Sequence, residues 1–317
     1  MSPDEEAIRV AGIRHTYGTR VALDDVSFSV RRGELFGLLG PNGGGKTTLF
    51  RMLATLLHVS RGDATVLGAS VRRAPAVVRR HLGVVFQHPS LDGMLTVSEN
   101  LACHGRLYGL RGAALGRRAT TLLDRMGLAD RADDRVATLS GGLQRRAELA
   151  KALLHAPPVL LLDEPSTGLD PGTRRDFLQY LSQLRDRDGV TIVLTTHYMD
   201  EAERCDRVAI LDCGRLISVD APHALKAEVG GEVIVVQTPD PHGLATRIQA
   251  RFGCAVSVVD GALRIERARG PGLVRDLVDA FPTEVTAVTY GKPTLEDVFI
   301  HLTGHRFWAA RGEATVA

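Results

Sequence analysis

One short segment constrains the fold of this 317-residue chain more than any other. The segment is Gly40-Pro-Asn-Gly-Gly-Gly-Lys-Thr-Thr48, which fits the phosphate-loop pattern G-x-x-x-x-G-K-[ST]. An apolar run over 35–39 precedes it, and apolar residues at helical spacing follow it from Leu49. A strand, a glycine-rich loop and a helix in this order can bind phosphate, because backbone N–H groups wrap the anion at the helix N-terminus. The segment therefore predicts an α/β domain with a phosphate-binding site.

Within this loop, we expect Lys46 to reach the β and γ phosphate oxygens and the Thr47 hydroxyl to ligate Mg²⁺. The alternative is a flexible glycine turn that holds no ligand. Lysine usage argues against that alternative, because the chain contains only four lysines and uses arginine almost everywhere else. The expected phosphate-binding residues are Gly40, Pro41, Asn42, Gly43, Gly44, Gly45, Lys46, Thr47 and Thr48.

The rest of the first two thirds of the chain alternates apolar runs with helical patterns. The runs lie at 35–39, 159–162, 190–194 and 208–211. Runs of this length predict buried strands, and their alternation with helices predicts an α/β fold with a parallel sheet. One helix should begin at Asp170, which can cap it, with Pro171 in its first turn. We place this nucleotide domain at 1–228 and expect a helical subdomain inserted at about 92–154.

A different pattern begins after Gly230-Gly231. The expected elements are strand, helix, two strands, helix and strand, at 232–238, 242–252, 254–259, 262–267, 273–281 and 284–290. This is the ferredoxin-like order, so we expect a small α+β domain at 232–304. A closing helix over 294–302 has Leu295, Val298, Phe299 and Leu302 on one face, which covers the small domain's sheet or packs elsewhere. Residues 305–317 are expected to form a disordered tail.

Two adjacent carboxylates, Asp163 and Glu164, follow the apolar run at 159–162. The carboxyl ends of parallel strands share one edge of a sheet, which should bring Gly40, Asp163 and His197 together. There, Asp163 could hold Mg²⁺, Glu164 could accept a hydrogen bond from the water that attacks the γ-phosphate, and His197 could contact that phosphate. The alternatives are a surface turn at Pro165 for the acidic pair, and a capping or core role for the histidine.

The segment Leu139-Ser-Gly-Gly142, followed by Leu143-Gln-Arg-Arg146, is similar to the signature motif of the ATP-binding-cassette (ABC) family. Other family landmarks occur in the expected order: Tyr17 for the adenine-stacking aromatic, Gln87 in Val-Phe-Gln-His-Pro, and Ser166-Thr-Gly-Leu-Asp170 for the D-loop. The resemblance covers about residues 7–228. It implies a phosphate-loop cassette with a parallel-sheet core, an antiparallel β part and an inserted helical subdomain.

The same resemblance implies ATP and Mg²⁺ as ligands. It assigns Glu164, His197, Lys46 and Gln87 to hydrolysis, the metal to Thr47, Gln87 and Asp163, and further nucleotide contacts to Tyr17 and Asp170. It also implies that two cassettes, by default two copies of this chain, meet head to tail. Each copy would then complete its partner's site with Ser140, Gly141 and Gly142. The chain departs from the family pattern at Leu143, where glutamine is most common, and at Gly44, where alanine is usual.

The C-terminal segment, Lys292 to Gly304, resembles the tail of daunorubicin-resistance-type exporter ATPases. This implies the ATPase subunit of an ABC exporter, held at the cytoplasmic face of the membrane by a separate permease, with drug, lipid, polysaccharide or ion as cargo. The alternatives are an importer ATPase and a soluble ATPase that remodels ribosomes or DNA. Remodelling ATPases carry two cassettes or long heptad insertions, whereas this chain has one phosphate loop and a short interval from Lys46 to Ser140.

Composition excludes other function classes. The net charge is only +2, from 39 basic and 37 acidic residues, so we expect no nucleic-acid partner. The four cysteines include no CxxC pair, which argues against a zinc site or a disulfide framework and fits a reducing compartment. No apolar run approaches the roughly 18 residues of a membrane span, so we expect membrane contact only through a partner.

Overall fold

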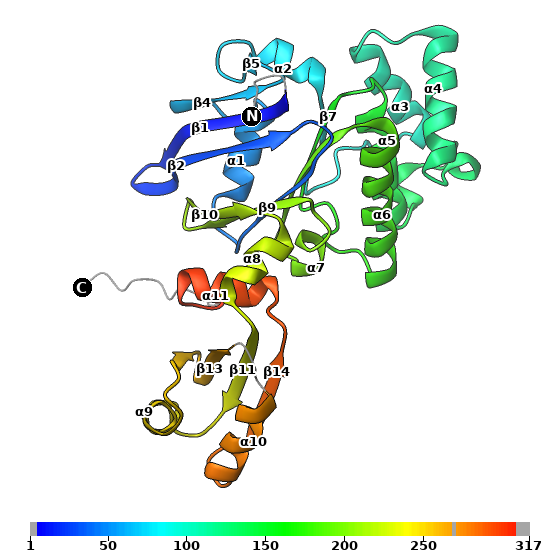
Figure 1. The fold of residues 1–317 in the computed structure, drawn as a ribbon. Helices are drawn as coiled ribbons and strands as arrows, with labels where there is room; N and C mark the ends of the chain where they lie inside the picture. The colour runs from blue at the N-terminus through cyan, green and yellow to red at the C-terminus, as the bar shows by residue number, and fades with distance from the viewer. Residues whose placement is uncertain (1–4, 268–270, 309–317) are drawn as a thin grey trace. The chain divides into compact units, whose positions relative to one another are not determined.

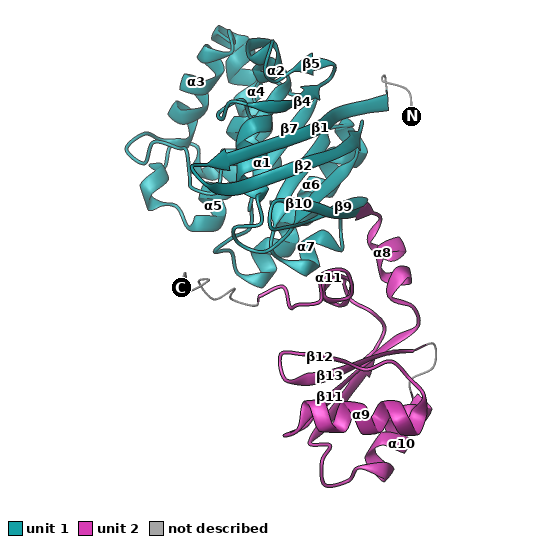
Figure 2. Ribbon diagram, turned by 90° about the vertical axis from the view of Figure 1, so that its left-hand side faces the viewer, with its two compact units in different colours: residues 1–218 teal, residues 219–317 magenta. Residues whose placement is uncertain are grey.

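The computed structural model describes residues 5–267 and 271–308 of the chain. The chain divides into two compact units, residues 1–218 and 219–317, which Figure 2 colours separately. Each unit is described by itself below. Among the described residues, no helix is both long enough and apolar enough to cross a bilayer.

Unit 1 is built on a six-stranded sheet in the order β10-β9-β3-β8-β7-β6 (Figure 1). Its strands are β3 (Leu35–Leu39), β6 (Leu82–Val85), β7 (Val159–Asp163), β8 (Thr191–Thr196), β9 (Arg207–Asp212) and β10 (Arg215–Asp220). The neighbours β9-β3-β8-β7-β6 all pair in parallel. Every residue of β3, β7 and β8 is buried, as continuous apolar runs predict. The predicted parallel-sheet core is confirmed.

A second sheet of unit 1 is antiparallel, in the order β2-β1-β4-β5. Its strands are β1 (Glu6–Tyr17), β2 (Arg20–Arg31), β4 (Arg61–Val66) and β5 (Ala69–Ser70). The tight turn between β1 and β2 places Tyr17 and Arg20 at one end of the hairpin. This sheet is the antiparallel β part that the family resemblance implied.

The helices next to the central sheet are α1 (Lys46–Leu53), α2 (Pro75–His81), α6 (Pro171–Asp188) and α7 (Met199–Ala202). Helix α6 begins where predicted, because the Asp170 carboxylate accepts hydrogen bonds from the N–H groups of Gly172 and Thr173, both at 3.0 Å. Helix α1 is shorter than its apolar spacing suggested. It ends at Leu53 because Thr55 adopts a left-handed backbone with φ of 61°, which leaves Leu56 exposed.

Three helices lie together at one end of unit 1, within the interval 92–154 (Figure 1). They are α3 (Val97–Leu107), α4 (Gly112–Arg125) and α5 (Gly141–Leu153), with short 3-10 turns η2 (Ala129–Arg131) and η3 (Val136–Thr138) between them. Helix α3 starts with a capping box, in which the Thr96 hydroxyl accepts from the Glu99 N–H and the Glu99 carboxylate accepts from the Thr96 N–H.

An aromatic cluster of His104, Tyr108 and His155 lies at the C-terminal ends of α3 and α5, and in it Tyr108 stacks on His155 at 3.8 Å between ring centroids. Burial, with a smaller contribution from the nearby Lys151, lowers the pKa of His104 to about 4. The unfolded chain therefore binds more protons between about pH 4 and 6.5, so stability is full above pH 6.5 and is lost as pH falls through that window. We expect His104→Gln to reduce this acid loss by about 2 kcal/mol between pH 7 and pH 5.

Chemical denaturation at pH 7 and pH 5 checks this expectation. The wild-type chain should lose more free energy of unfolding between the two pH values than His104→Gln does. Equal losses in the two proteins would show that His104 does not cause the pH dependence.

Unit 2 contains an antiparallel sheet in the order β12-β13-β11-β14. Its elements are α8 (Pro222–Val229), β11 (Glu232–Gln237), α9 (Pro241–Phe252), β12 (Ser257–Val259), β13 (Ala262–Arg267), α10 (Pro271–Ala280), β14 (Ala287–Gly291) and α11 (Leu295–Thr303). The sheet from β11 to β14 has the ferredoxin-like topology, and helices α9 and α10 bury leucines and isoleucines against it. The predicted fold class is confirmed.

Several features of unit 2 differ in extent from the sequence analysis. Strand β12 begins at Ser257 instead of 254. Strand β14 begins at Ala287 instead of 284, because the N–H groups of Glu284 and Val285 still bond to the Phe281 carbonyl in a continued turn. The expected tail begins later than residue 305, because Phe307 is only 1% exposed and packs edge-on against Phe299. Residues 309–317 of that tail lie outside the described residues.

The closing helix α11 starts at a capping box of Thr294 and Asp297. Its residues Leu295, Val298 and Phe299 are fully buried. The helix packs against α8. Arg264 on β13 also donates to the Asp297 carboxylate, so α11 is tied to the sheet as well.

Candidate functional site

The phosphate loop joins β3 to α1 and lies under a hollow of about 160 Å³. Gly45 is the N-cap of α1, with φ of 103°, and a Cβ there would lie 2.7 Å from the Ala22 carbonyl oxygen. Only glycine fits this position without strain. The hollow is lined by Tyr17, Arg20, Ala22, Pro41, Asn42, Gly43, Gly45, Lys46, Thr47, Thr48 and Glu164.

Lys46 is the buried cation of the loop, with 4% of its surface exposed. Its ammonium donates to the Gly40 carbonyl at 2.7 Å and to the Pro41 carbonyl at 3.1 Å, and lies 3.5 Å from Glu164 Oε1. Burial lowers the pKa of Lys46, and the Glu164 carboxylate opposes that shift. A buried ammonium in the first turn of a helix suits a polyanionic ligand.

Asp163 is the last residue of β7 and Glu164 follows it, and Thr195 on β8 holds both residues. The Thr195 hydroxyl donates to Asp163 Oδ1 at 2.6 Å and accepts from the Glu164 N–H at 2.9 Å. Burial raises the pKa of Asp163, while the Thr195 hydrogen bond opposes the shift. A nearby cation would offset this desolvation, and the oxygens of Asp163, Thr47 and Gln87 are the ligand type that Mg²⁺ prefers.

The Glu164 side chain is where the predicted residues of hydrolysis meet. Its Oε2 accepts a hydrogen bond from Gln87 Nε2 at 3.2 Å and lies 3.2 Å from His197 Nδ1, while its Oε1 faces Lys46. The Glu164 backbone is left-handed, with φ of 43°, which is uncommon for a residue with a side chain. Strained backbones of this kind cluster at functional sites.

The hollow is lined next to Tyr17 by a charged residue that the sequence analysis missed. Tyr17 lies in the lining as predicted and is 48% exposed. Arg20 also lines the hollow, and its guanidinium lies next to Gly43 of the phosphate loop. The sequence signal was a basic residue three positions after the aromatic residue, at the start of the next strand.

The signature residues lie apart from this hollow. Ser140 caps α5 by accepting from the Leu143 N–H at 3.4 Å, and Gly141 and Gly142 form the first turn of the helix. A Cβ on Gly142 would lie 2.9 Å from the Thr173 side chain, so α5 starts close to α6 and its N-cap, Asp170. None of these signature residues lines the hollow at the phosphate loop of the same chain.

The sequence analysis also missed a buried hydrogen bond beside the D-loop. The Ser166 hydroxyl bonds to the Glu201 carboxylate on α7, and both residues are buried. Burial raises the pKa of Glu201 to about 7. This bond ties the D-loop to the segment that follows His197.

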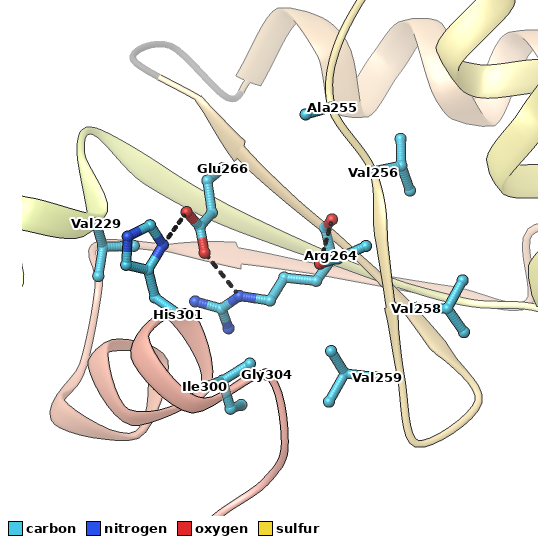
Figure 3. A pocket seen from close by; sticks show the side chains of 11 residues that line it. Val229, Ala255, Val256, Val258, Val259, Arg264, Glu266, Ile300, His301 and Gly304 are labelled. Atoms are coloured by element: carbon cyan, nitrogen blue, oxygen red, sulfur yellow. Dashed lines mark hydrogen bonds and ion pairs between the residues drawn. The ribbon is translucent and has the colours of Figure 1, made fainter. Parts of the chain in front are cut away.

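A larger hollow of about 510 Å³ lies in unit 2, between β12, β13 and α11 (Figure 3). Figure 3 shows Glu266 between His301, at 2.8 Å, and Arg264, at 3.0 Å. The rest of its lining is mostly aliphatic, and it contains none of the predicted site residues. The phosphate-loop hollow is smaller, yet it contains residues predicted to act in hydrolysis, such as Lys46 and Glu164.

The fold and the phosphate-loop geometry define a nucleotide-binding enzyme of the phosphate-loop class. The "ABC transporter" family model matches residues 23–167. The chain is 40% identical over 300 residues to Nod factor export ATP-binding protein I of Rhizobium johnstonii, covering 94% of this chain and 95% of the relative. It is 38% identical to daunorubicin resistance ATP-binding protein DrrA2 of Streptomyces coeruleorubidus, covering 96% and 97%.

Solved structures of ABC transporter cassettes are also similar to this chain. CbiO1 of Clostridium perfringens, part of the ABC transporter complex cbiONQ, has a TM-score of 0.65 at 26% identity and covers 78% of this chain and 96% of that one. The cassette MJ0796, solved as a dimer bound to ADP and Pi, has a TM-score of 0.62 at 28% identity, covering 68% and 98%. The chain belongs to the ABC transporter family and is an ATP-binding, ATP-hydrolysing cassette.

Proposed function

We propose that this ATPase drives an exporter whose membrane permease is a separate polypeptide, and that it acts at the cytoplasmic face of the membrane. The support is the match to the Nod factor export and daunorubicin resistance proteins, which extends over unit 2 as well as the cassette. These relatives favour export over import and over remodelling of ribosomes or DNA. The permease would select the cargo.

One observation carries the enzymatic part of the proposal: Lys46, Gln87 and His197 all face the Glu164 carboxylate beside the phosphate loop. We infer that the loop N–H groups and Lys46 hold the phosphates, with Tyr17 on the adenine. Thr47, Asp163 and Gln87 would hold Mg²⁺, which when bound neutralises charge on the β and γ phosphates.

In this arrangement Glu164 orients the attacking water and accepts its proton. His197 lies beside the same Glu164 oxygen, Oε2, as Gln87, and would contact the γ-phosphate. Lys46 stabilises the charge that develops on the phosphate oxygens as the bond to the leaving group breaks. The buried Thr195 keeps the Glu164 backbone and Asp163 in place.

The signature residues imply a second cassette. Ser140 and Gly141 are exposed and lie outside the chain's own hollow, so they are available to a partner. We infer that two copies meet head to tail, with Ser140, Gly141 and Gly142 of one copy against the γ-phosphate held by the other. Asp170 caps α6 next to Gly142 and would lie in the same interface.

Co-purification tests the exporter proposal. The tagged Glu164→Gln chain is expressed in its native host, membranes are solubilised in mild detergent with ATP, and the bound proteins are identified by mass spectrometry. We expect a polytopic membrane protein that is enriched over a parallel purification of the Lys46→Met chain. Enrichment of ribosomal or DNA-repair proteins without a membrane protein would contradict export and leave the ATPase assignment intact.

A further inference from the structure

Helix α5 buries three charged side chains on one face: Arg145, Glu148 and Lys151. Their exposed fractions are 7%, 1% and 9%. Charged groups are rarely buried to this degree unless they are paired, because each loses several kcal/mol of hydration. All three reach the same short segment, 86–90, which contains Gln87.

Glu148 and Lys151 hold the far end of that segment through a single residue, Ser90. Glu148 Oε1 accepts from the Ser90 N–H at 2.6 Å and lies 3.1 Å from its hydroxyl. The Lys151 ammonium donates to the Ser90 carbonyl at 2.9 Å and to its hydroxyl. Every polar group of Ser90 is therefore bonded to α5.

Arg145 holds the near end of the segment and the acidic strand end together. Its guanidinium donates to the carbonyl of Phe86, the residue before Gln87, and pairs with Glu148 at 2.7 Å. It also donates to the carbonyls of Pro165 at 2.6 Å, Asp163 at 3.3 Å and Glu164 at 3.4 Å. One side chain thus bonds to the backbones that carry Gln87 and Glu164.

We propose that Arg145, Glu148 and Lys151 form a clamp of positioning residues that sets the distance between Gln87 and Glu164 for ATP hydrolysis. Helix α5 begins at the signature residues Ser140 to Gly142, so the helix that meets the partner cassette also holds both ends of the Gln87 segment. A displacement of α5 is passed to Gln87 through hydrogen bonds at Phe86 and Ser90. The proposal rests on the roles given above to Gln87 and Glu164.

Stability alone is a weak explanation for the clamp. Replacing a buried ion pair by apolar residues of similar volume is often neutral or stabilising, so a helix that only had to pack here would not need Glu148 and Lys151. Burial lowers the pKa of Lys151, and Glu148 opposes that shift. Glu148 and Lys151 provide hydrogen bonds to Ser90 that apolar side chains on this face of the helix could not make.

The test measures kcat and KM for ATP, the Kd for ADP and the melting temperature of the full chain carrying Glu148→Gln. Glutamine keeps the shape of the side chain but loses the charge. We expect kcat to fall about tenfold or more while the Kd for ADP stays within twofold, because the clamp does not contact the phosphate loop. The matched control is Asp134→Asn, which disrupts an exposed Arg131–Asp134 pair of the same i, i+3 spacing and should leave both values unchanged.

Ser90→Ala provides a second, milder variant in case Glu148→Gln does not fold. It should lower kcat less than Glu148→Gln, and the double variant should be no slower than Glu148→Gln alone, because both changes act through the same bonds. The proposal is overturned if a folded Glu148→Gln chain keeps wild-type kcat. It is also overturned if kcat, ADP affinity and melting temperature fall together, or if the two effects simply add. Failure of the proposed hydrolysis chemistry would show separately, as normal turnover by Glu164→Gln.

Discussion

Replacing Glu164 by glutamine is expected to lower kcat for ATP hydrolysis by about 10²- to 10³-fold while leaving ATP binding intact. Glutamine preserves the shape of the side chain and can still accept a hydrogen bond from Gln87, but it cannot take a proton from water. The loss of the charge that faces Lys46 and His197 also removes the group that orients the water. Phosphate release measures turnover, and size-exclusion chromatography with ATP measures whether the variant accumulates as a closed dimer.

The matched control for this variant is Glu228→Gln, an exposed glutamate on α8. It should hydrolyse ATP at the wild-type rate. If Glu164→Gln also hydrolysed ATP at the wild-type rate, Glu164 would not be the base, and the proton would have to pass to another group near the γ-phosphate.

Replacing Lys46 by methionine is expected to weaken ADP binding by about 10- to 150-fold, which corresponds to roughly 1.5–3 kcal/mol for a buried charged hydrogen bond. Methionine fills a similar volume, so the loop keeps its packing. It leaves the phosphates without their cation and leaves Glu164 Oε1 without the ammonium at 3.5 Å, which adds repulsion between Glu164 and the nucleotide. Isothermal titration with ADP measures the effect directly.

Lys292→Met, an exposed lysine at the start of the C-terminal segment, serves as the control and should bind ADP as the wild type does. Lys46→Arg should also bind poorly, because the larger guanidinium does not fit a site with 4% exposure. Wild-type affinity in Lys46→Met would show that backbone N–H groups alone hold the phosphates.

The convergence of Lys46, Glu164 and His197 could be predicted because each follows a parallel strand at the carboxyl edge of one sheet. Gln87 follows β6 at the same edge, although the sequence suggested its role only through family resemblance. Thr195 could not be recognised in this way. Within a buried strand it looks like an ordinary β-branched residue, and its two hydrogen bonds depend on the register between β7 and β8.

The clamp on α5 could not be predicted from the sequence either. Arg145, Glu148 and Lys151 look like the solvated face of a helix, because charged residues on helices usually face water. Their burial depends on the segments at 86–90 and 163–165, which come from distant parts of the chain and dock on α5 only in the folded domain. Local patterns predict which elements form, whereas the pairing of buried polar groups requires their arrangement in space.

The packing of α11 on α8 has a consequence for how the chain is made. Helix α8 leaves the ribosome before α11, the helix that packs against it, which lies about 65 residues further along the chain. At 5–20 residues per second, translation needs roughly 3–13 s to supply it. During that time the apolar face of α8 is open to other nascent chains and to chaperones, so slower elongation across unit 2 should increase aggregation, and the yield of folded protein should depend on codon usage there.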